Sequence, residues 1–268
     1  MKYVAAILLF FWAGLLRPLS VGAQQGNPDW HSYKTDFSTA MKLGNALYSQ
    51  LKPAEQEFVS SQPISIDVDP APFVRMFQYP EEPKPIRGVC ISAGFVDLVN
   101  RVAHAKAIDT KKKGYFNAYI QQLSAESGEK ELKPIPDQTD SSFWTDRMLD
   151  EQASNFNSIV GVVLGIKLAH HYLGHYDKYR DKLNTQGTPT PIENLVTPEE
   201  WEEAFAQGVR NALDAGCLIE GVIPFFEAFD KMNKRPGWTA YFLPERVQVP
   251  KMRAELERIQ KVFLTGHE

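Results

Sequence analysis

The chain has little of several things that mark common protein classes. Its 268 residues include only two cysteines, Cys90 and Cys217, which excludes a small scaffold held together by several disulfides. Basic residues are not in excess, since 29 Lys and Arg stand against 33 Asp and Glu. The resulting net charge of −4 gives no field for nucleic acid, and we expect no nucleic-acid partner. Neither an internal repeat nor a low-complexity tract is present, so the composition predicts an ordinary globular fold.

Long hydrophobic runs are also missing, because the longest apolar stretch covers only residues 4–16. This stretch is too short to span a bilayer, which takes roughly 20 residues. It follows Lys2 and precedes the small residues of Val21-Gly22-Ala23, the pattern of a secretory signal peptide. We expect residues 1–23 to be this signal and cleavage to follow Ala23, with an uncleaved N-terminal anchor as the alternative. The mature chain is then secreted or periplasmic, without a stable membrane span.

Along most of the chain, apolar residues recur at the spacing of α-helices. Residues 24–268 show no convincing boundary, and we expect a single domain of helix-dominated α+β class with a small strand region near its N-terminus. In an exported chain Cys90 and Cys217 are permitted to pair, but two free thiols fit the sequence equally well. The main expected elements are a helix over 37–51 behind Asp36 as N-cap, strands over 64–68 and 86–94, and helices over 142–183 and 198–216.

Three of the six histidines lie in residues 167–179, "KLAHHYLGHYDKY". On a continuous helix, residues four apart share one face. We therefore expect His171 and His175 to converge on one ion and His170 to point elsewhere. The apolar residues upstream predict that this helix runs through the core. Two imidazoles one turn apart are a known beginning of a zinc site. The alternative is that His170 and His175 are exposed, His171 is hydrogen-bonded in the core, and no metal binds.

Four segments in order extend this pattern: "ISAGFVDLV", "LAHHYLGH", "EEAFAQGVRNALDAG" and "EGVIPFFEAFDKM". In this order they resemble the gluzincin zinc metallopeptidases, in the branch of the CAAX prenyl endopeptidases and the bacterial periplasmic β-barrel assembly-enhancing protease. The resemblance covers roughly residues 87–258, with an insertion around residues 110–150. It implies a zincin-like metallopeptidase domain with the HxxxH helix at its centre.

The resemblance also shows where this chain departs from the family. The two zinc ligands of the family fall on His171 and His175, but the catalytic Glu falls on Tyr172. The third ligand, also Glu in the family, falls on Trp201, and Phe205 replaces the Asp of the same helix. A shift of one residue would instead offer Glu200 or Glu203 as a ligand, although acidic residues in a first helical turn are usually solvated.

Tyr172 is a poor general base, because its ordinary pKa is near 10. Without the base and the third ligand, proteolytic activity is expected to be degenerate or lost. The resemblance then implies a pseudoenzyme that acts by binding a polypeptide or cell-envelope protein, with zinc as an optional cofactor. Two alternatives remain: an active zinc hydrolase that uses His171, His175 and Glu200 or Glu203, and a metal-free structural envelope protein.

Overall fold

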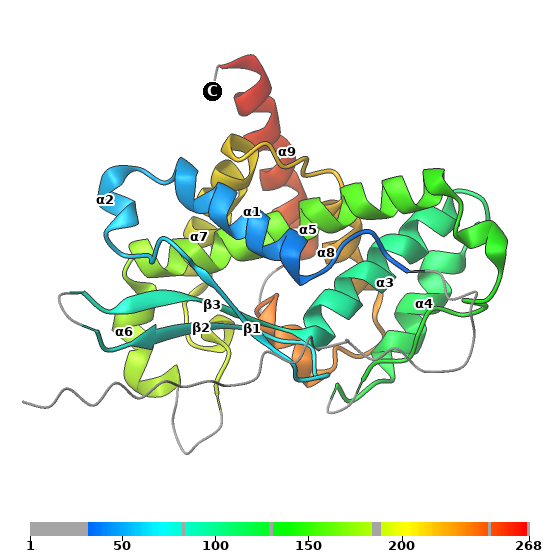
Figure 1. The fold of residues 1–268 in the computed structure, drawn as a ribbon, viewed down its shortest axis with the longest axis horizontal. Coiled ribbons are helices and arrows are strands. Elements are labelled where there is room, and N and C mark those ends of the chain that lie inside the picture. The colour runs from blue at the N-terminus through cyan, green and yellow to red at the C-terminus, as the bar shows by residue number, and fades with distance from the viewer. Residues whose placement is uncertain (1–31, 82–83, 129–130, 184–188, 246–247, 267–268) are drawn as a thin grey trace, which may run out of the picture. The chain divides into compact units, whose positions relative to one another are not determined.

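The structure is a computed structural model that describes residues 32–81, 84–128, 131–183, 189–245 and 248–266. The predicted signal peptide lies outside these residues. The described residues from Ser32 onward belong to one compact unit. They form nine α-helices, three strands and three short 3-10 helices (Figure 1). In chain order the elements are α1 (Phe37–Gln50), α2 (Pro53–Gln56), β1 (Ile64–Asp67), β2 (Val74–Tyr79), β3 (Ile86–Ser92), α3 (Ala93–Asp109), α4 (Tyr115–Ser124), η1 (Ser141–Phe143), α5 (Asp146–Tyr172), α6 (His175–Leu183), η3 (Ile192–Asn194), α7 (Pro198–Asp214), α8 (Val222–Lys231), η4 (Gly237–Tyr241) and α9 (Val249–Thr265).

The expected helix-dominated α+β class is confirmed. Helix α5 packs against α1, α3, α7 and β3, and its residues from Ser158 to His171 are all buried. The prediction that the histidine helix runs through the core is therefore correct. Among the described residues, no helix is long and apolar enough to cross a membrane.

The sheet is small and has three strands in the order β1-β3-β2. β1 runs parallel to β3 and β2 runs antiparallel to it. Ile66 of β1 and Val74 of β2 both lie opposite Ile91 of β3, so these three apolar side chains share one face of the sheet. Val74 and Ile91 are fully buried, which fixes this face toward the helices. The sequence prediction located β1 and β3 but missed β2, so it did not reveal that the sheet ends in an antiparallel edge.

Close helix contact depends on two glycines at the crossing of α5 and α7. A Cβ atom on Gly165 would lie 2.5 Å from the carbonyl oxygen of Gly208, and one on Gly208 would lie 2.4 Å from the backbone nitrogen of Ile166. Only glycine allows the two backbones to approach this closely. The crossing therefore sets how far the α7 side chains lie from the histidines of α5.

The region of the expected insertion, residues 110–150, contributes to the core. Helix α4 packs against α3 and α8, and buries Tyr119, Ile120 and Leu123 completely. Within the described residues, it is thus a structural part of the fold. The two cysteines, Cys90 and Cys217, are free thiols.

Candidate functional site

The helix that carries the histidines ends earlier than expected. α5 stops at Tyr172, and Gly174 adopts a left-handed conformation with φ of +78° before α6 begins at His175. A left-handed residue is a common way to end a helix, and glycine adopts it without steric cost. Because the chain turns at Gly174, His175 no longer lies on the helix face of His171.

His170, not His171, faces His175. The Nδ1 atoms of His170 and His175 lie 2.9 Å apart, with ring centroids 5.1 Å apart. One neutral ring donates this hydrogen bond and the other accepts it. The predicted pairing of His171 with His175 is wrong, as is the expectation that His170 points elsewhere. The alternative that His170 and His175 are exposed is wrong too, because the two residues are only 0% and 6% exposed.

Burial keeps this pair uncharged. It lowers the pKa of His170 well below the ordinary value, and nearby Lys167 lowers it further. The pKa of His175 is lowered by burial as well, against the opposing effect of Glu200 and Glu203. Two neutral imidazoles in contact can exchange or hold a proton. Only the ring that donates this hydrogen bond keeps a free lone pair, on its Nε2, because the lone pair of the accepting ring is used in the bond.

His171 has a hydrogen-bond partner in the sheet. Its Nε2 donates a hydrogen bond of 2.9 Å to the backbone oxygen of Gly88 in β3, and its ring lies 4.8 Å from that of Tyr176. Burial lowers the pKa of His171 to about 4, so the ring is neutral at physiological pH. The hydrogen bond ties the end of α5 to the centre of the sheet.

Tyr172 does not have the properties of a base. The side chain packs against the main hydrophobic core, and burial raises its pKa above the already high ordinary value. A phenol of this kind keeps its proton at neutral pH and acts only as a hydrogen-bond donor or acceptor.

The two acidic candidates on α7 have different surroundings. The side chain of Glu203 is 57% exposed, and its Oε2 lies 3.9 Å from Nε2 of His175. Glu200 accepts hydrogen bonds from Lys178 at 2.5 Å, from Tyr179 at 2.8 Å and from the backbone of Thr197 at 2.9 Å. Burial alone would raise the pKa of Glu200, but these donors outweigh it and lower the pKa to about 2. Glu200 is therefore a capping and ion-pairing residue.

At the expected position of the third ligand, the side chain belongs to the core. Trp201 is 0% exposed and Phe205 is 1% exposed. Their rings stack with centroids 5.2 Å apart and an interplanar angle of 18°. Both side chains are buried, although the indole Nε1–H of Trp201 has no hydrogen-bond partner among the described residues. The α7 helix therefore offers no carboxylate at these two positions.

These residues do not fit a zinc ion of the usual kind. His170 occupies Nδ1 of His175, whereas Glu203 approaches the opposite nitrogen, Nε2, and His171 bonds a backbone carbonyl. A structural or catalytic zinc needs three or four ligands that point at one position. In the part of the chain that the structure describes, no group of three or more His, Cys, Asp or Glu side chains is placed to hold a metal. Zinc binding by His171, His175 and Glu200 or Glu203 stays a prediction that this donor arrangement does not favour.

The sequence reasoning missed a buried ion pair beside the histidines. Nζ of Lys167 donates a hydrogen bond of 2.5 Å to Oε1 of Glu193, and the two side chains are 2% and 1% exposed. Burial lowers the pKa of Lys167 and raises that of Glu193, while their mutual attraction opposes both shifts. The available signal was a lysine within the apolar run "GVVLGIKLA", although its partner on η3 could not be read from the sequence.

His104 of α3 is a core histidine with two partners. Its Nε2 donates to the backbone oxygen of Phe143 at 2.7 Å, and its Nδ1 lies 3.3 Å from the hydroxyl of Tyr33. Burial lowers its pKa. This geometry explains the histidine without a ligand.

Beside Lys167, a groove of about 180 Å³ runs along the edge strand of the sheet. Its walls come from β2, from the segment that leads into η3 and from η4. Arg75 spans it, since the Nε of this residue donates to the Tyr241 hydroxyl at 3.3 Å. The lining residues include Arg75, Phe77, Tyr79, Thr190, Pro191 and Tyr241.

No protein-family profile, curated protein or solved structure matches this chain. The site is therefore interpreted from its own geometry.

Proposed function

We propose that this protein is a degenerate, non-hydrolytic relative of the gluzincin metallopeptidases that acts by binding polypeptide. The observation that carries the proposal is the packing of Trp201, which lies fully buried against Phe205 where the family has its third ligand. A carboxylate at this position would be desolvated in an apolar core unless a metal paired with it. The indole belongs to the core of the described fold. A tryptophan in place of the third zinc ligand explains how the metallopeptidase scaffold is kept while the zinc chemistry is lost.

The open edge of β2 supports a polypeptide as the partner. β2 pairs with β3 on one side only, and no backbone hydrogen bond among the described residues satisfies its other side. An extended segment can add to such an edge as a further strand, with its side chains in adjoining pockets. The groove beside β2 offers apolar contact through Phe77 and Tyr79, and Arg75 is available for an acidic or carbonyl group.

The N-terminal sequence supports action outside the cytoplasm, where a cell-envelope polypeptide is the natural partner. The proposal therefore describes an exported binding protein. Zinc is not required for it, because neither β2 nor its groove depends on a metal.

The first experiment measures metal and hydrolysis. Mature protein carrying residues 24–268 is purified, its zinc content is determined, and it is incubated with a broad peptide panel. We expect less than one zinc per chain and no cleavage. Stoichiometric zinc that disappears in His175→Ala, together with peptide cleavage, would contradict the proposal and favour the active hydrolase.

The second experiment measures binding at the β2 edge. A library of unstructured peptides is screened, and the best binder is titrated against wild type, Tyr79→Ser and Phe263→Ser. Tyr79 is 58% exposed at the groove, whereas Phe263 is 48% exposed near the end of α9. We expect Tyr79→Ser to weaken binding about tenfold, the cost of one lost aromatic contact at an interface, and Phe263→Ser to have no effect. Equal losses in both variants, or no binding by wild type, would support the metal-free structural alternative.

A further inference from the structure

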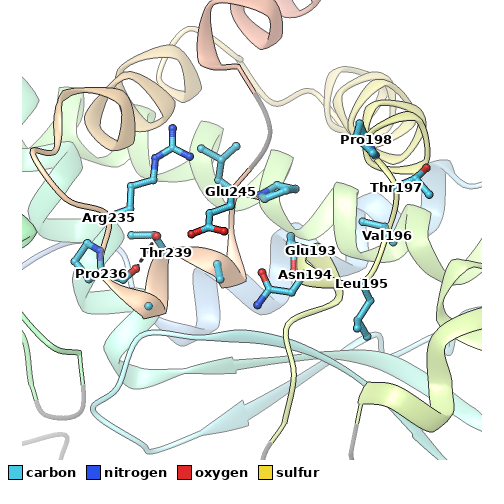
Figure 2. A pocket seen from close by; sticks show the side chains of 14 residues that line it. Glu193, Asn194, Leu195, Val196, Thr197, Pro198, Arg235, Pro236, Thr239 and Glu245 are labelled. Atoms are coloured by element: carbon cyan, nitrogen blue, oxygen red, sulfur yellow. Dashed lines mark hydrogen bonds between the residues drawn. The ribbon is translucent and has the colours of Figure 1, made fainter.

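A second and larger pocket shares no lining residue with the β2 groove. Its volume is about 580 Å³, and its walls are the segment Glu193–Pro198, leading from η3 into α7, and the segment Arg235–Glu245, which contains η4 (Figure 2). Pockets of about 300–1,000 Å³ are the usual size for small-molecule sites. Neither the histidine pair nor the β2 edge contributes to it, so its role is independent of the proposed function.

Two opposite charges line this pocket and do not neutralise each other. Nε of Arg235 donates to the backbone oxygen of Phe229 at 3.3 Å, which leaves the two terminal nitrogens of the guanidinium. Neither Arg235 nor Glu245 forms an ion pair with any described residue. In Figure 2 both side chains rise from the segment around η4. A ligand with complementary charges can therefore use both groups without breaking an existing ion pair.

The third charged group of the pocket lining is Glu193, which is buried. Its Oε1 accepts the hydrogen bond from Lys167, whereas its Oε2 is buried and has no partner among the described residues. Buried carboxylate oxygens nearly always have a donor. Because the Glu193 side chain is only 1% exposed, it cannot contact a ligand directly and acts on the pocket only as a buried charge that Lys167 offsets.

The balance of charge selects the class of ligand. Lys167 offsets Glu193, so Arg235 and Glu245 leave the pocket with no net charge. A polyanion such as a nucleotide would meet the carboxylate of Glu245, and a simple cation would meet the guanidinium of Arg235; both are disfavoured. A small zwitterion satisfies both signs, while Leu195, Val196 and Leu243 provide apolar surface for a side chain.

We propose that this pocket binds a small zwitterion of the amino-acid or short-peptide class. The carboxylate of the ligand pairs with the guanidinium of Arg235, and its ammonium group lies against the carboxylate of Glu245. Polar side chains of Asn194 and Thr239 lie in the same lining and can accept or donate the remaining hydrogen bonds.

The test uses calorimetric titration of the mature full chain with L-leucine and L-leucyl-L-leucine. The matched probes are 3-methylbutylamine, which lacks the carboxylate of leucine, and 4-methylpentanoate, which lacks its ammonium group. We expect saturable binding of at least one zwitterion, at least tenfold tighter than binding of either single-charge probe. No saturable binding of either zwitterion, or binding no tighter than that of the single-charge probes, would overturn the proposal.

Two variants assign the contacts. Arg235→Gln is expected to weaken zwitterion binding at least tenfold, because one charge-assisted pair is worth about that factor or more, and to leave binding of 3-methylbutylamine unchanged. Glu245→Gln should show the reverse selectivity and lose little affinity for 4-methylpentanoate. Arg180→Gln, an exposed arginine on α6 outside the pocket lining, is the matched control and should bind as wild type. Glu245 is exposed, so its variant keeps the test decisive if Arg235→Gln does not fold; unchanged zwitterion affinity in Glu245→Gln would contradict the proposal.

Discussion

At the scale of single residues, Lys167 and Glu193 form a buried ion pair whose desolvation is costly. Both side chains are almost completely buried, and removing two charges from water costs several kcal/mol for each ion before their attraction repays it. The pair is therefore weak support for stability as such. Each of the two charges is nevertheless tolerated in the core only while its counter-charge is present.

Lys167→Met is expected to lower the free energy of unfolding by about 3–5 kcal/mol, because it leaves the Glu193 carboxylate buried without its counter-charge. The double variant Lys167→Met/Glu193→Leu should recover most of this loss, since it leaves no charge in the core. Urea denaturation at pH 7 measures all three chains. Lys34→Met is the control, because the side chains of Lys34 and its partner Asp150 are 48% and 70% exposed. If Lys167→Met cost no more than Lys34→Met, the buried pair would not exist in solution.

His171 makes stability depend on pH. Burial lowers its folded-state pKa from 6.5 to about 4, so below pH 6.5 the unfolded chain binds a proton that the folded chain does not. Stability from this group is complete above pH 6.5 and is lost as pH falls toward 4. The total loss is about 3 kcal/mol, from about 1.4 kcal/mol for each unit of pKa difference.

The corresponding variant is His171→Gln, which cannot titrate but keeps an amide donor for the Gly88 oxygen. Its free energy of unfolding should be lower than that of wild type at pH 7, and it should fall less steeply between pH 7 and pH 4.5. Urea denaturation at several pH values gives both curves. Parallel curves would contradict the assigned pKa.

At the scale of secondary-structure elements, one glycine decides which histidines meet. Gly174 has φ of +78°, and a Cβ atom there would find nothing within 4 Å. Gly174→Ala should therefore cost only the strain of a left-handed alanine, about 1–2 kcal/mol. Gly237 also has open space around a new Cβ, but its φ is not in the left-handed region. Thermal unfolding should show a clear loss for Gly174→Ala and little change for Gly237→Ala; similar midpoints for the two variants would show that the turn between α5 and α6 is not held in this conformation.

The same glycine marks the limit of what the sequence predicts. The sequence correctly predicted α1 with its Asp36 cap, α7 and the buried course of α5. It predicted a continuous helix past Gly174, because the residues on either side keep an amphipathic pattern, and the histidine pairing followed from this assumption. A glycine near a helix end is tolerated or terminating depending on tertiary contacts, which here include the bond from His171 to Gly88.

Strand β2 was missed for a different reason. It follows two prolines and reads "VRMFQY", without the alternation that a half-buried strand shows. Its position depends on antiparallel pairing with β3, the next strand along the chain, and periodicity within one strand does not report such pairing. The open edge and its groove, on which the proposed binding of polypeptide rests, therefore became visible only in three dimensions.

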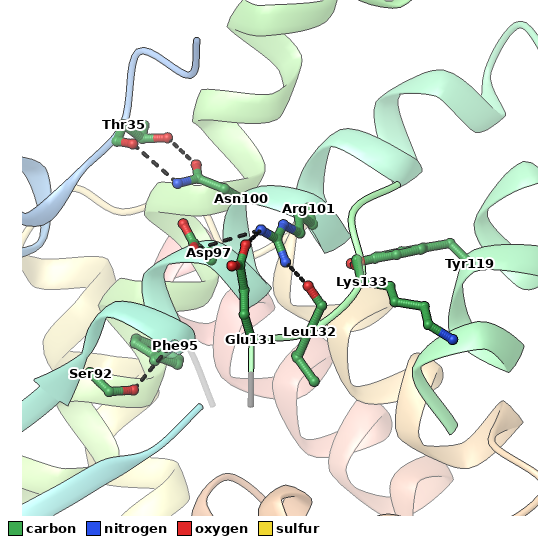
Figure 3. Close-up of polar contacts among 10 residues, drawn as sticks. All are labelled: Thr35, Ser92, Phe95, Asp97, Asn100, Arg101, Tyr119, Glu131, Leu132 and Lys133. Carbon is green, nitrogen blue, oxygen red and sulfur yellow. Dashed lines mark hydrogen bonds and ion pairs between the residues drawn. The ribbon is translucent and has the colours of Figure 1, made fainter. Parts of the chain in front are cut away.

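At the scale of the whole molecule, the residues before α1 fasten two central helices. Thr35 is 5% exposed and hydrogen-bonded through both its hydroxyl and its backbone oxygen to Asn100 of α3 (Figure 3). Gln152 of α5 donates to the Thr35 hydroxyl at 3.1 Å and to Oδ1 of Asn100 at 2.7 Å. Three polar side chains that are far apart in the sequence thus bond to one another inside the core, where any one left alone would be costly. Oε1 of Gln152 is the exception, since it has no partner among the described residues.

Removing this segment should destabilise the fold as a whole. A chain that begins at Phe37 leaves Asn100 and Gln152 buried without the Thr35 groups, and each such loss costs about 1–3 kcal/mol. It also removes Asp36, whose side chain caps α1, at a cost of about 1 kcal/mol. The comparison is between chains that begin at Gln24 and at Phe37, with Thr35→Val in the longer chain to isolate the hydroxyl.

Urea midpoints give the ranking. We expect the chain from Gln24 to be the most stable, Thr35→Val to be intermediate and the chain from Phe37 to be the least stable, with Lys34→Ala close to the first. If α3 and α5 unfold in one cooperative transition, the loss of the Thr35 hydrogen bonds lowers the urea midpoint of that single transition. Equal midpoints for the chains from Gln24 and Phe37 would mean that this segment is only laid on the surface, and that Asn100 and Gln152 find their partners elsewhere.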